Sequence, residues 1–537
     1  VWRVAMRIIP CPKEFTKKDG SFLFDAETGF SCDYENVGNS ISSFLKTCGI
    51  GWRTGDDIKF TSDGSDSSSE AYTLVVGEDG VKVSAKSERG LFYGAQTLKQ
   101  LILSSFDEKT KTAEIPCCEI NDEPRFSYRG YMFDTVRHFF PVEVVKKYIE
   151  AISLLKLNVF HWHLSDDQGW RVQIDKYPRL TEHGSMRRET CGDKKPHGGF
   201  YTKEQIKDVV EFAKERFITV IPEFDIPGHT RAAVSSYPEL GCSKKPVEVS
   251  TKFGIHSEIL CAGREESYDF VKGVLTEFAE MFPSKYIHIG GDEAVKHEWY
   301  KCKDCQKKMK ELGLRNEEEL QAYFTEKAVE YLKSLNKTTI CWNESANSGK
   351  LESSVILQFW SDGKDNENVI REVKNGRKII VSKFNPYYLD YPYPMHSLKA
   401  AYEFEPVFHG IEGYEQNVLG VESTLWTELI DNTFLLAFRV FPRLSALAES
   451  AWCDKSKKDY LAFENSLKNV NKLIENTTGI KAAPLKDCNV KNPLKRAAIM
   501  MKFGMHLIDF EMIARSNRAA KEMKKMRSVR KKENNGK

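Results

Sequence analysis

The stretch LNVFHWHLSDD, residues 157–167, is a short, mostly apolar run that ends in two carboxylates, Asp166 and Asp167. A run of this length, rich in β-branched and aromatic side chains, indicates a buried strand. Apolar residues recur at helical spacing on both sides of it, over residues 141–156 and 202–217. A strand flanked by helices is the repeating unit of a parallel sheet. The stretch therefore predicts an α/β fold.

Seven further segments share this pattern of an apolar, β-rich run with a polar end. With residues 157–167 they make eight, and the seven span residues 128–137, 218–229, 285–293, 338–345, 355–362, 378–390 and 418–429. Helical patterns lie between several of them, for example at residues 317–335. Eight such units close into a barrel. We predict a (β/α)₈ TIM barrel as the catalytic domain, over residues 125–480.

The flanking regions differ from the barrel in their patterns. Residues 1–124 combine strand-like alternation around the turn at 78–80 with a helical pattern at 88–105, which predicts a small α+β domain. The last barrel helix, within residues 431–452, is expected to break or bend near Pro442. Residues 481–537 form a basic C-terminal extension, and residues 495–530 are expected to form one amphipathic helix.

Charge is concentrated at the C-terminal end of the chain. The 537 residues carry a net charge of +2, but residues 515–537 alone carry +8, which leaves −6 on the rest. A basic run of this kind could meet RNA or anionic lipid, although such runs are more often solvated tails. We assign it no function and expect no nucleic-acid partner. No run of 18 apolar residues occurs, so no membrane span is expected.

Polar and aromatic residues gather at the C-terminal ends of the eight predicted strands, which is the catalytic face of a barrel. They are Asp134, Arg137, Asp166, Asp167, Glu223, Asp225, His229, Asp292, Glu293, Trp342, Glu344, Trp360, Asp362, Tyr388, Asp390, Trp426 and Glu428. Structural pairing explains some of these acids, and Asp134, Glu223, Glu344 and Asp362 fit a scaffold as well as they fit a site. The stability of the fold alone does not require carboxylates mixed with aromatic rings at one face of the barrel.

Carboxylates beside aromatic rings suit a carbohydrate, whose hydroxyls pair with acids and whose C–H faces pack on indole rings. In this interpretation Trp342, Trp360 and Trp426 would wall the pocket. Arg137, Asp390 and Glu428 could fix hydroxyls by charge-assisted hydrogen bonds. The alternative is that the three tryptophans are core residues.

The adjacent acids Asp292 and Glu293 are unusual for a sugar-cleaving enzyme, because two catalytic carboxylates normally stand about 5–10 Å apart across the scissile bond. Neighbours on a strand also project to opposite sides, so the Gly290-Gly291 pair must reorient one of them. Glu293 could then protonate the departing oxygen. If the substrate carries a 2-acetamido group, its carbonyl oxygen can attack C1 while Asp292 accepts the amide N–H, and no protein nucleophile is needed.

The motifs RGYMFDTVRHFFP, LNVFHWHLSDDQGWR, PEFDIPGHT, HIGGDEA, YYLD and LWTE, in this order, resemble glycoside hydrolase family 20, the β-N-acetylhexosaminidases. The resemblance covers roughly residues 80–455, and the first lobe also resembles the non-catalytic α+β domain that precedes the barrel in that family. It implies an exo-acting, retaining enzyme that removes terminal β-linked N-acetylglucosamine or N-acetylgalactosamine through an oxazolinium intermediate. Glu293 would be the general acid and then base, Asp292 would orient the acetamido group, and Tyr388 would donate to its carbonyl.

The same resemblance implies roles for the residues that bind the sugar. Arg137 would hold the O3/O4 side, and Asp390 and Glu428 the O4/O6 side. Asp166 and His229 would support the ionisation of the acid. The aromatic walls would be Trp342, Trp360 and Trp426.

Two other functions remain open from the sequence. His161 and His163 share one strand face, which suggests a metal-dependent amidohydrolase barrel, although both precede the strand end. A carbohydrate-binding protein without catalysis is the second alternative. The sequence does not show whether the sugar that is removed is N-acetylglucosamine or N-acetylgalactosamine. It also does not show whether the protein is a monomer or a homodimer.

The thirteen cysteines make some disulfides plausible. Cys302 and Cys305 form a CxxC pair, but a zinc ribbon needs a second such pair. We therefore expect no metal site and no cofactor. Sequons at Asn336, Asn343 and Asn476 weakly favour a glycoprotein in a secreted, lysosomal or vesicular location.

Overall fold

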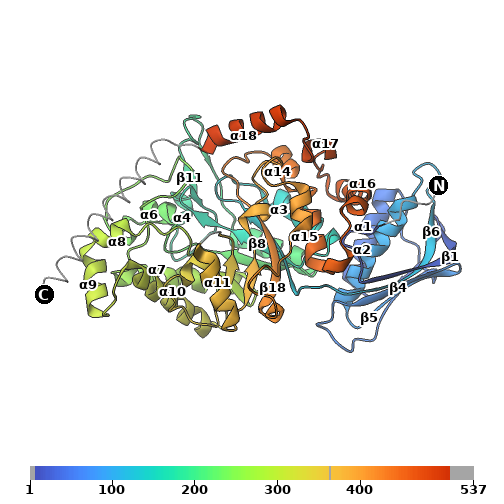
Figure 1. Cartoon of the computed structure of the whole chain (residues 1–537), viewed down its shortest axis with the longest axis horizontal. Coiled ribbons are helices and arrows are strands. Elements are labelled where there is room, and N and C mark those ends of the chain that lie inside the picture. Colours follow the sequence, from blue (N-terminus) through green and yellow to red (C-terminus); the bar gives the residue numbers. More distant parts are fainter. Residues whose placement is uncertain (1–6, 362–363, 508–537) are drawn as a thin grey trace.

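Each of the eight predicted segments contributes one strand to a closed parallel barrel (Figure 1). The structure is a computed structural model that describes residues 7–361 and 364–507. The strands are β7 (Tyr128–Asp134), β8 (Val159–His163), β13 (Thr219–Glu223), β14 (Tyr286–His288), β15 (Thr338–Trp342), β16 (Ile356–Phe359), β17 (Ile379–Val381) and β18 (Val418–Leu425). They pair in chain order, and β18 closes the barrel on β7. The predicted barrel is confirmed.

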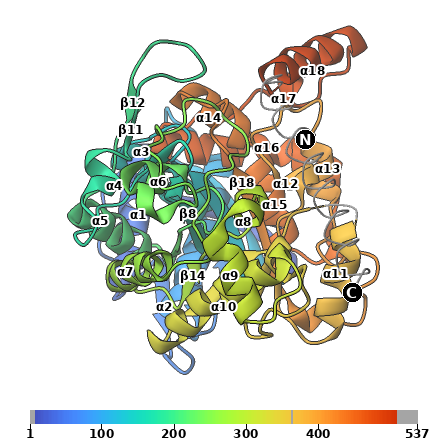
Figure 2. The same cartoon turned by 90° about the vertical axis from the view of Figure 1, so that its left-hand side faces the viewer.

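Helices surround the strands, and Figure 2 shows them around the barrel. The main ones are α3 (Val142–Leu154), α5 (Lys203–Lys214), α7 (Glu265–Met281), α10 (Glu317–Ser334), α11 (Lys364–Lys374), α13 (Leu398–Glu403), α14 (Thr433–Val440) and α15 (Arg443–Trp452). Helix α5 shows why these segments are helical. Thr202 and Gln205 form a capping box at its start, and its apolar residues Ile206, Val209 and Ala213 are buried on one face.

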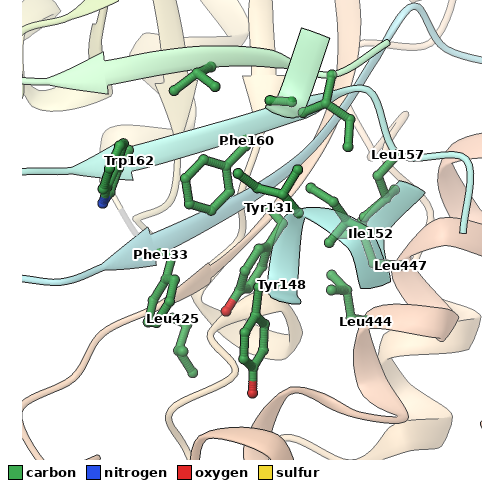
Figure 3. Packing of buried hydrophobic residues seen from close by; sticks show 14 of the residues in the cluster. Tyr131, Phe133, Tyr148, Ile152, Leu157, Phe160, Trp162, Leu425, Leu444 and Leu447 are labelled. Carbon is green, nitrogen blue, oxygen red and sulfur yellow. The ribbon is translucent and has the colours of Figure 1, made fainter. Parts of the chain in front are cut away.

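The layer between strands and helices is a packed apolar core. Figure 3 shows Tyr131 and Phe160 of the strands against Tyr148 of α3, with Leu444 and Leu447 of α15 beside them. The rings of Tyr131 and Tyr148 stack at 6.1 Å between centroids. Because helices cover the outside of the barrel and side chains fill its inside, all five residues of β8 are buried.

The first lobe is an α+β unit built on one six-stranded sheet. Its strands are β1 (Glu14–Phe24), β2 (Phe30–Cys32), β3 (Ile58–Ser62), β4 (Tyr72–Gly77), β5 (Gly80–Ala85) and β6 (Ala113–Asp122), in the order β1-β6-β4-β5-β3-β2. Helices α1 (Glu35–Cys48) and α2 (Glu88–Ser105) pack against it. The antiparallel pair β4 and β5 turns at residues 78–79, as the sequence predicts.

Buried ion pairs join this lobe to the barrel. Arg129 of β7 contacts Glu70 at 2.9 Å, and the Arg129 side chain has no exposed surface. Lys156 contacts Asp122 of β6 at 3.0 Å, with both side chains fully buried. Asp122 also accepts a hydrogen bond from Trp452 Nε1 of α15 at 2.8 Å. The lobe is thus fixed to the barrel by charged groups that are fully buried, except for Glu70, whose side chain is 12% exposed.

The C-terminal part begins after the break at Pro442, which separates α14 from α15 as predicted. Helix α16 (Tyr460–Thr478) packs against α1, α2 and α3. Two more helices follow, α17 (Leu485–Cys488) and α18 (Pro493–Leu507). The rest of the predicted helix over 495–530, and the basic tail, lie outside the described residues. In the described part of the chain, no helix combines the length and apolarity needed to cross a bilayer.

Candidate active site

A cavity of the barrel opens at the C-terminal ends of its strands. Nine of the eleven predicted site residues line it. The lining residues are Arg137, His229, Asp292, Glu293, Trp360, Phe384, Tyr388, Asp390, Tyr391, Trp426, Glu428, Leu429 and Phe503. The loops after β7, β13, β14, β16, β17 and β18 all contribute. The two predicted residues that do not line it are Asp166 and Trp342.

A glycine turn after β14 brings both neighbouring acids to the cavity. Gly290 and Gly291 have φ of 60° and 102°, in the left-handed region that favours glycine. A Cβ on Gly290 would lie 1.7 Å from Asp225 Oδ1, so no other residue fits there. The turn is pinned because the Gly291 N–H donates to the same oxygen at 2.9 Å. Glu293 itself has a φ of 46°, a conformation that is rare outside glycine and is typical of functional sites.

His229 lies against both acids. Its Nε2 is 3.5 Å from Glu293 Oε2 and 4.0 Å from Asp292 Oδ2. On the other side of the ring, Nδ1 contacts Asp166 Oδ1 at 3.1 Å. Burial acts to lower the pKa of His229, but the Asp166 carboxylate raises it well above its usual value. The ring is therefore an imidazolium that donates toward the pair of acids.

Asp166 does not line the cavity but contacts two residues that do. It contacts Arg137 at 2.7 Å as well as His229, and its side chain is fully buried. Burial acts to raise the pKa of Asp166, but Arg137 and His229 hold it well below its usual range. The Arg137 guanidinium lies 4.9 Å from the centre of the Trp426 ring, which is a cation–π distance. Asp166 thus positions a cation on each side of the cavity without facing it.

Two acids of the cavity lack the partners that Asp166 has. Asp292 Oδ1 and Asp390 Oδ1 are buried and accept no hydrogen bond from any described residue. Burial and the Asp225 carboxylate raise the pKa of Asp292 well above its usual value. Burial and the Glu428 carboxylate raise the pKa of Asp390 to about 8. Buried polar atoms are normally paired, so these oxygens are suited to accept hydrogen bonds from a bound molecule.

Aromatic rings form one side of the cavity. Tyr388 lies between two indoles, with its ring centroid 6.0 Å from that of Trp360 and 6.3 Å from that of Trp426. The Trp360 Nε1 is buried and has no hydrogen-bond partner among the described residues. These rings give the apolar faces on which a pyranose packs.

Trp342 is not a wall of the cavity, contrary to the expectation from the sequence. It is the last residue of β15 and its side chain is fully buried. Its Nε1 donates to Glu223 Oε1 at 2.8 Å, and its ring lies 5.9 Å from the ring of Trp426. Trp342 therefore supports the wall from the barrel interior. Side chains alternate along a strand, so a strand-end position alone does not say which way the ring points.

The acids that fitted scaffold and site equally well have different surroundings. Asp134 accepts hydrogen bonds from the N–H groups of Val136 and Thr427 at 2.7 and 2.9 Å, which ties the loops after β7 and β18 together. Glu344 accepts a hydrogen bond from the Glu293 N–H at 3.0 Å and so holds the turn that carries Asp292 and Glu293. Asp362 lies outside the described residues.

The histidines that suggested a metal-dependent barrel belong to a buried network in the barrel interior. His161 contacts Glu422 at 2.9 Å and Glu223 at 3.3 Å. His163 contacts Glu223 at 2.5 Å and Asp166 at 2.9 Å. Both side chains are buried and neither lines the cavity. Their positions explain the HWH pattern as a charged support for the strand ends.

Four lining residues were missed from the sequence: Phe384, Tyr391, Leu429 and Phe503. Tyr391 directly follows the predicted segment 378–390, so extending that segment by one residue would have found it. Leu429 is the last residue of the predicted segment 418–429, but an apolar side chain there gave no reason to place it in the site. Phe503 comes from α18, on which we expected no functional residue. Its ring lies 5.1 Å from that of Tyr391 at the cavity. The sequence carries no signal for this contact, because nothing in it says where α18 packs.

Comparisons with known proteins agree with this geometry. Residues 126–455 match the family model "Glycosyl hydrolase family 20, catalytic domain", and residues 5–123 match "Glycosyl hydrolase family 20, domain 2". The chain is 35% identical over 495 residues to a beta-hexosaminidase of Porphyromonas gingivalis, an alignment that covers 86% of this chain and 62% of that protein. It is 32% identical to the human beta-hexosaminidase subunit beta, covering 79% of this chain and 74% of that one.

Solved structures show the same likeness. The exo beta-N-acetylglucosaminidase of Vibrio harveyi, in complex with N-acetylglucosamine, superposes with a TM-score of 0.80 at 32% identity, covering 89% of this chain and 78% of that one. The Streptomyces plicatus beta-hexosaminidase mutant, in complex with product, superposes with a TM-score of 0.77 at 29% identity, covering 91% and 97%. The amidohydrolase and the non-catalytic alternatives are therefore set aside. The chain belongs to glycosyl hydrolase family 20 and is an exo-acting β-N-acetylhexosaminidase.

Proposed function

We propose that Glu293 and Asp292 share one substrate-assisted reaction in this hydrolase, with retention at the anomeric carbon. Glu293 protonates the leaving oxygen, and the 2-acetamido carbonyl oxygen of the sugar attacks C1. Asp292 accepts the amide N–H and stabilises the charge of the oxazolinium intermediate. Glu293 then removes a proton from the water that opens the intermediate.

The position of His229 carries this proposal. Carboxylate oxygens of both acids lie within 4.0 Å of the same Nε2 atom, so the two acids stand on one side of the cavity. A pair that worked as acid and nucleophile would have to face each other across the scissile bond. Neighbouring acids on one side can instead serve the leaving oxygen and the adjacent acetamido group. This arrangement leaves the attack to the substrate.

Exposure separates the roles of the two acids. The Glu293 side chain is 34% exposed, so it can reach the leaving group at the mouth of the cavity. The Asp292 side chain is 12% exposed and lies near Tyr388, whose pKa is raised well above its usual value by burial and by the Asp292 carboxylate. Tyr388 thus keeps its proton and can donate to the acetamido carbonyl. An amide N–H is itself a donor, so a bound acetamido group favours the ionised form of Asp292.

The remaining polar residues fit the hydroxyls of a terminal sugar. Arg137 presents a guanidinium for the O3/O4 side. Asp390 and Glu428 present carboxyl groups for the O4/O6 side, and the unpartnered Asp390 Oδ1 is suited to accept from a hydroxyl. Trp360 and Trp426 pack against the ring. Because Asp166 fixes Arg137 and His229 together, the recognition of the sugar and the protonation of the leaving group share one support.

A hydrolysis panel tests the mechanism. We expect cleavage of aryl β-glycosides that carry a 2-acetamido group and little cleavage of the matched 2-hydroxy compounds, with the β-anomer as first product by NMR. Asp292→Ala should lose most activity on the acetamido substrates and gain no advantage on the hydroxy ones. Equal rates on the two substrate series, or an α-anomer as first product, would contradict substrate assistance.

The substrate class is carbohydrate, and the finer assignments are proposals. We propose activity on both N-acetylglucosamine and N-acetylgalactosamine at chain ends, as chitooligosaccharides or glycoconjugates, which rates on the two epimeric aryl glycosides would compare. A homodimer is also proposed, and light scattering of the purified chain tests it.

A secreted, lysosomal or vesicular location, with N-glycans, is a further proposal. Asn336 and Asn476 are exposed and accessible to glycosylation. Asn343 is buried, and its Nδ2 donates to Ser361 Oγ at 2.8 Å, so the folded chain cannot carry a glycan there. The mass of the chain from its natural host before and after N-glycosidase treatment tests this, with at most two glycans expected.

A further inference from the structure

Four cysteines from two segments of the chain, one between β13 and α7 and the other at the start of α9 (Lys303–Glu311), come together in the folded protein. They are Cys242, Cys261, Cys302 and Cys305. The Sγ atom of Cys305 is 3.9 Å from that of Cys242 and 3.6 Å from that of Cys261, and Cys261 Sγ is 3.8 Å from Cys302 Sγ. All four sulfurs lie within 4.8 Å of one another, and none forms a disulfide. The four thiols therefore form one compact cluster.

The spacing of the sulfurs identifies what they suit. A tetrahedral zinc site with Zn–S bonds of about 2.3 Å has neighbouring sulfurs about 3.8 Å apart. A disulfide places them about 2.0 Å apart. The distances of 3.6, 3.8 and 3.9 Å match the edges of a tetrahedron. No pair among them is close to bonding length.

The backbone builds this arrangement from two pieces. Gly241 and Leu260 form an antiparallel bridge, and the Cys261 N–H donates to the Leu240 carbonyl at 2.8 Å, which sets Cys242 and Cys261 side by side. The second piece is the start of α9 (Lys303–Glu311), where Cys302 is the N-cap and Cys305 lies in the first turn. The positive end of the helix dipole favours thiolates at this place.

A glycine allows the two pieces to meet. A Cβ on Gly263 would lie 2.2 Å from the carbonyl carbon of Asp304 and 2.3 Å from the Cys305 nitrogen, so only glycine permits this approach. Arg264 follows, and its guanidinium donates to the Gly241 carbonyl and lies against Cys261. Four thiolates around a divalent cation carry a net charge of −2, which this guanidinium and the start of α9 offset. Cys261 and Cys305 are buried, which protects the site from water.

We propose that Cys242, Cys261, Cys302 and Cys305 bind one Zn²⁺ ion as a structural tetrathiolate site. Four protein ligands leave no open position, so the ion has a structural and not a catalytic role. The single CxxC pair of the sequence does not predict this site, because a zinc ribbon needs a second such pair. The fold supplies the other two ligands from residues that are far apart in a loop and are brought together by the Gly241–Leu260 bridge.

The proposed ion braces the two loops that carry the acid and its histidine. The Leu260 N–H donates to the Pro227 carbonyl at 3.1 Å, two residues before His229. The Leu260 carbonyl accepts from Trp299 Nε1 at 2.8 Å, on α8 (His297–Lys301) between Glu293 and Cys302. Zinc would therefore tie the loop after β13 to the loop after β14. This inference does not depend on the mechanism proposed above.

Metal content of the purified full-length chain tests the proposal directly. We expect one zinc per chain by elemental mass spectrometry after dialysis against metal-free buffer. Cys302→Ser and Cys305→Ser should each lose this zinc, whereas Cys341→Ser, at a buried cysteine of β15, should keep it. Replacement by Co²⁺ should give the visible absorption of a tetrahedral tetrathiolate. A wild-type chain without zinc, or variants that keep it, would overturn the proposal even if some variants fold poorly.

A thiol count separates zinc from disulfides. After unfolding with a chelator and no reductant, alkylation should modify all four cysteines in the wild-type chain. Peptides crosslinked between Cys242 and Cys305, or between Cys261 and Cys302, would show disulfides instead and contradict the metal site. Removing the ion from the native protein should lower Tm by roughly 5–10 °C, because a ligand that binds only the folded chain stabilises it.

Discussion

Two groups of buried carboxylates in the barrel differ in their partners. In the interior, Glu223 accepts a hydrogen bond from Trp342 at 2.8 Å and contacts His163 at 2.5 Å. Burial acts to raise the pKa of Glu223, but His163 and the neighbouring histidines hold it well below its usual range. At the cavity, Asp292 and Asp390 each keep an oxygen without a partner among the described residues, and burial raises both pKa values.

The difference separates acids that hold the barrel together from acids that are placed to accept hydrogen bonds from a bound molecule. Both kinds lie in or near the end of an apolar, β-rich segment, so they look alike in the sequence. In the folded chain, Glu223 has its charge satisfied by protein cations, whereas Asp292 and Asp390 retain hydrogen-bonding capacity. Substitution of the first kind should therefore cost stability, and substitution of the second kind should cost activity or substrate affinity.

Glu293→Gln should give the largest effect on the cavity side. We expect kcat/KM on a β-linked disaccharide to fall by about 10²–10⁴-fold, because the leaving oxygen loses its acid. The loss should be smaller on an aryl glycoside, whose leaving group needs less protonation. Glu298→Gln on α8 is the matched control and should stay within about twofold. An equal loss on both substrates would argue against Glu293 as the acid.

Glu223→Gln tests the interior side, with stability as the readout. The change leaves buried histidine cations without their counter-ion, and breaking such a pair costs roughly 3–5 kcal/mol of unfolding free energy. Urea unfolding measures it. Asp208→Asn, which removes a surface pair with Lys146, should cost at most about 1 kcal/mol. A stable Glu223→Gln chain with lost activity would place Glu223 with the cavity acids instead.

The same network makes a pH prediction. Burial acts to lower the pKa values of His161 and His163, but Glu422 and Glu223 raise them to about 9 and about 10. Both exceed the unfolded value of about 6.5, so their contribution to stability is complete below that pH and is lost as the pH rises through 9 and 10. Thermal unfolding of Glu223→Gln should show a weaker fall over this range than the wild type.

Asp390→Asn should stabilise the chain while weakening substrate binding. The pKa of Asp390 is about 8 in the folded chain and about 4 when unfolded, so the folded form holds the extra proton and stability falls as pH rises from 4 to 8. An asparagine side chain does not ionise, so the substitution removes this loss of stability with rising pH. We expect a gain of about 1–3 kcal/mol at pH 8, because water in the cavity reduces the full effect, and no gain at pH 4. A rise in KM should accompany it. Lower stability at pH 8 would contradict the assignment.

Phe503→Ala should have the smallest effect of these substitutions. We expect Phe503 to lie at the outer edge of the cavity. Its ring packs on Tyr391, so its loss should raise KM for a disaccharide by about two- to tenfold and leave an aryl monosaccharide nearly unchanged. Met501→Ala, on the exposed face of α18, is the matched control. An equal change on both substrates would place Phe503 at the terminal sugar instead.

The sequence predicted those features that depend on local pattern. Eight apolar runs with polar ends were enough for the barrel, and Pro442 was enough for the break between α14 and α15. The adjacent acids also required a glycine turn, which Gly290 and Gly291 form. These features follow from residues close together in the chain.

Features that depend on distant segments could not be predicted. Phe503 reaches the cavity only because of where α18 packs. The cysteine cluster needs loops that the sequence keeps apart, so counting CxxC motifs missed it. Trp342 was misplaced for a different reason, since a strand-end residue can face either the cavity or the interior and its neighbours do not decide which. In all three cases, the packing of distant segments against one another determines where the side chains lie.

The buried pairs of Arg129 with Glu70 and of Lys156 with Asp122 have a consequence for dissecting the protein. A catalytic half produced alone, starting after the first lobe, would keep both cations and lose both anions. It would also open the fully buried faces around them to solvent. We therefore expect that a gene cut between the two domains would not yield an active enzyme, although the boundary is recognisable in the sequence.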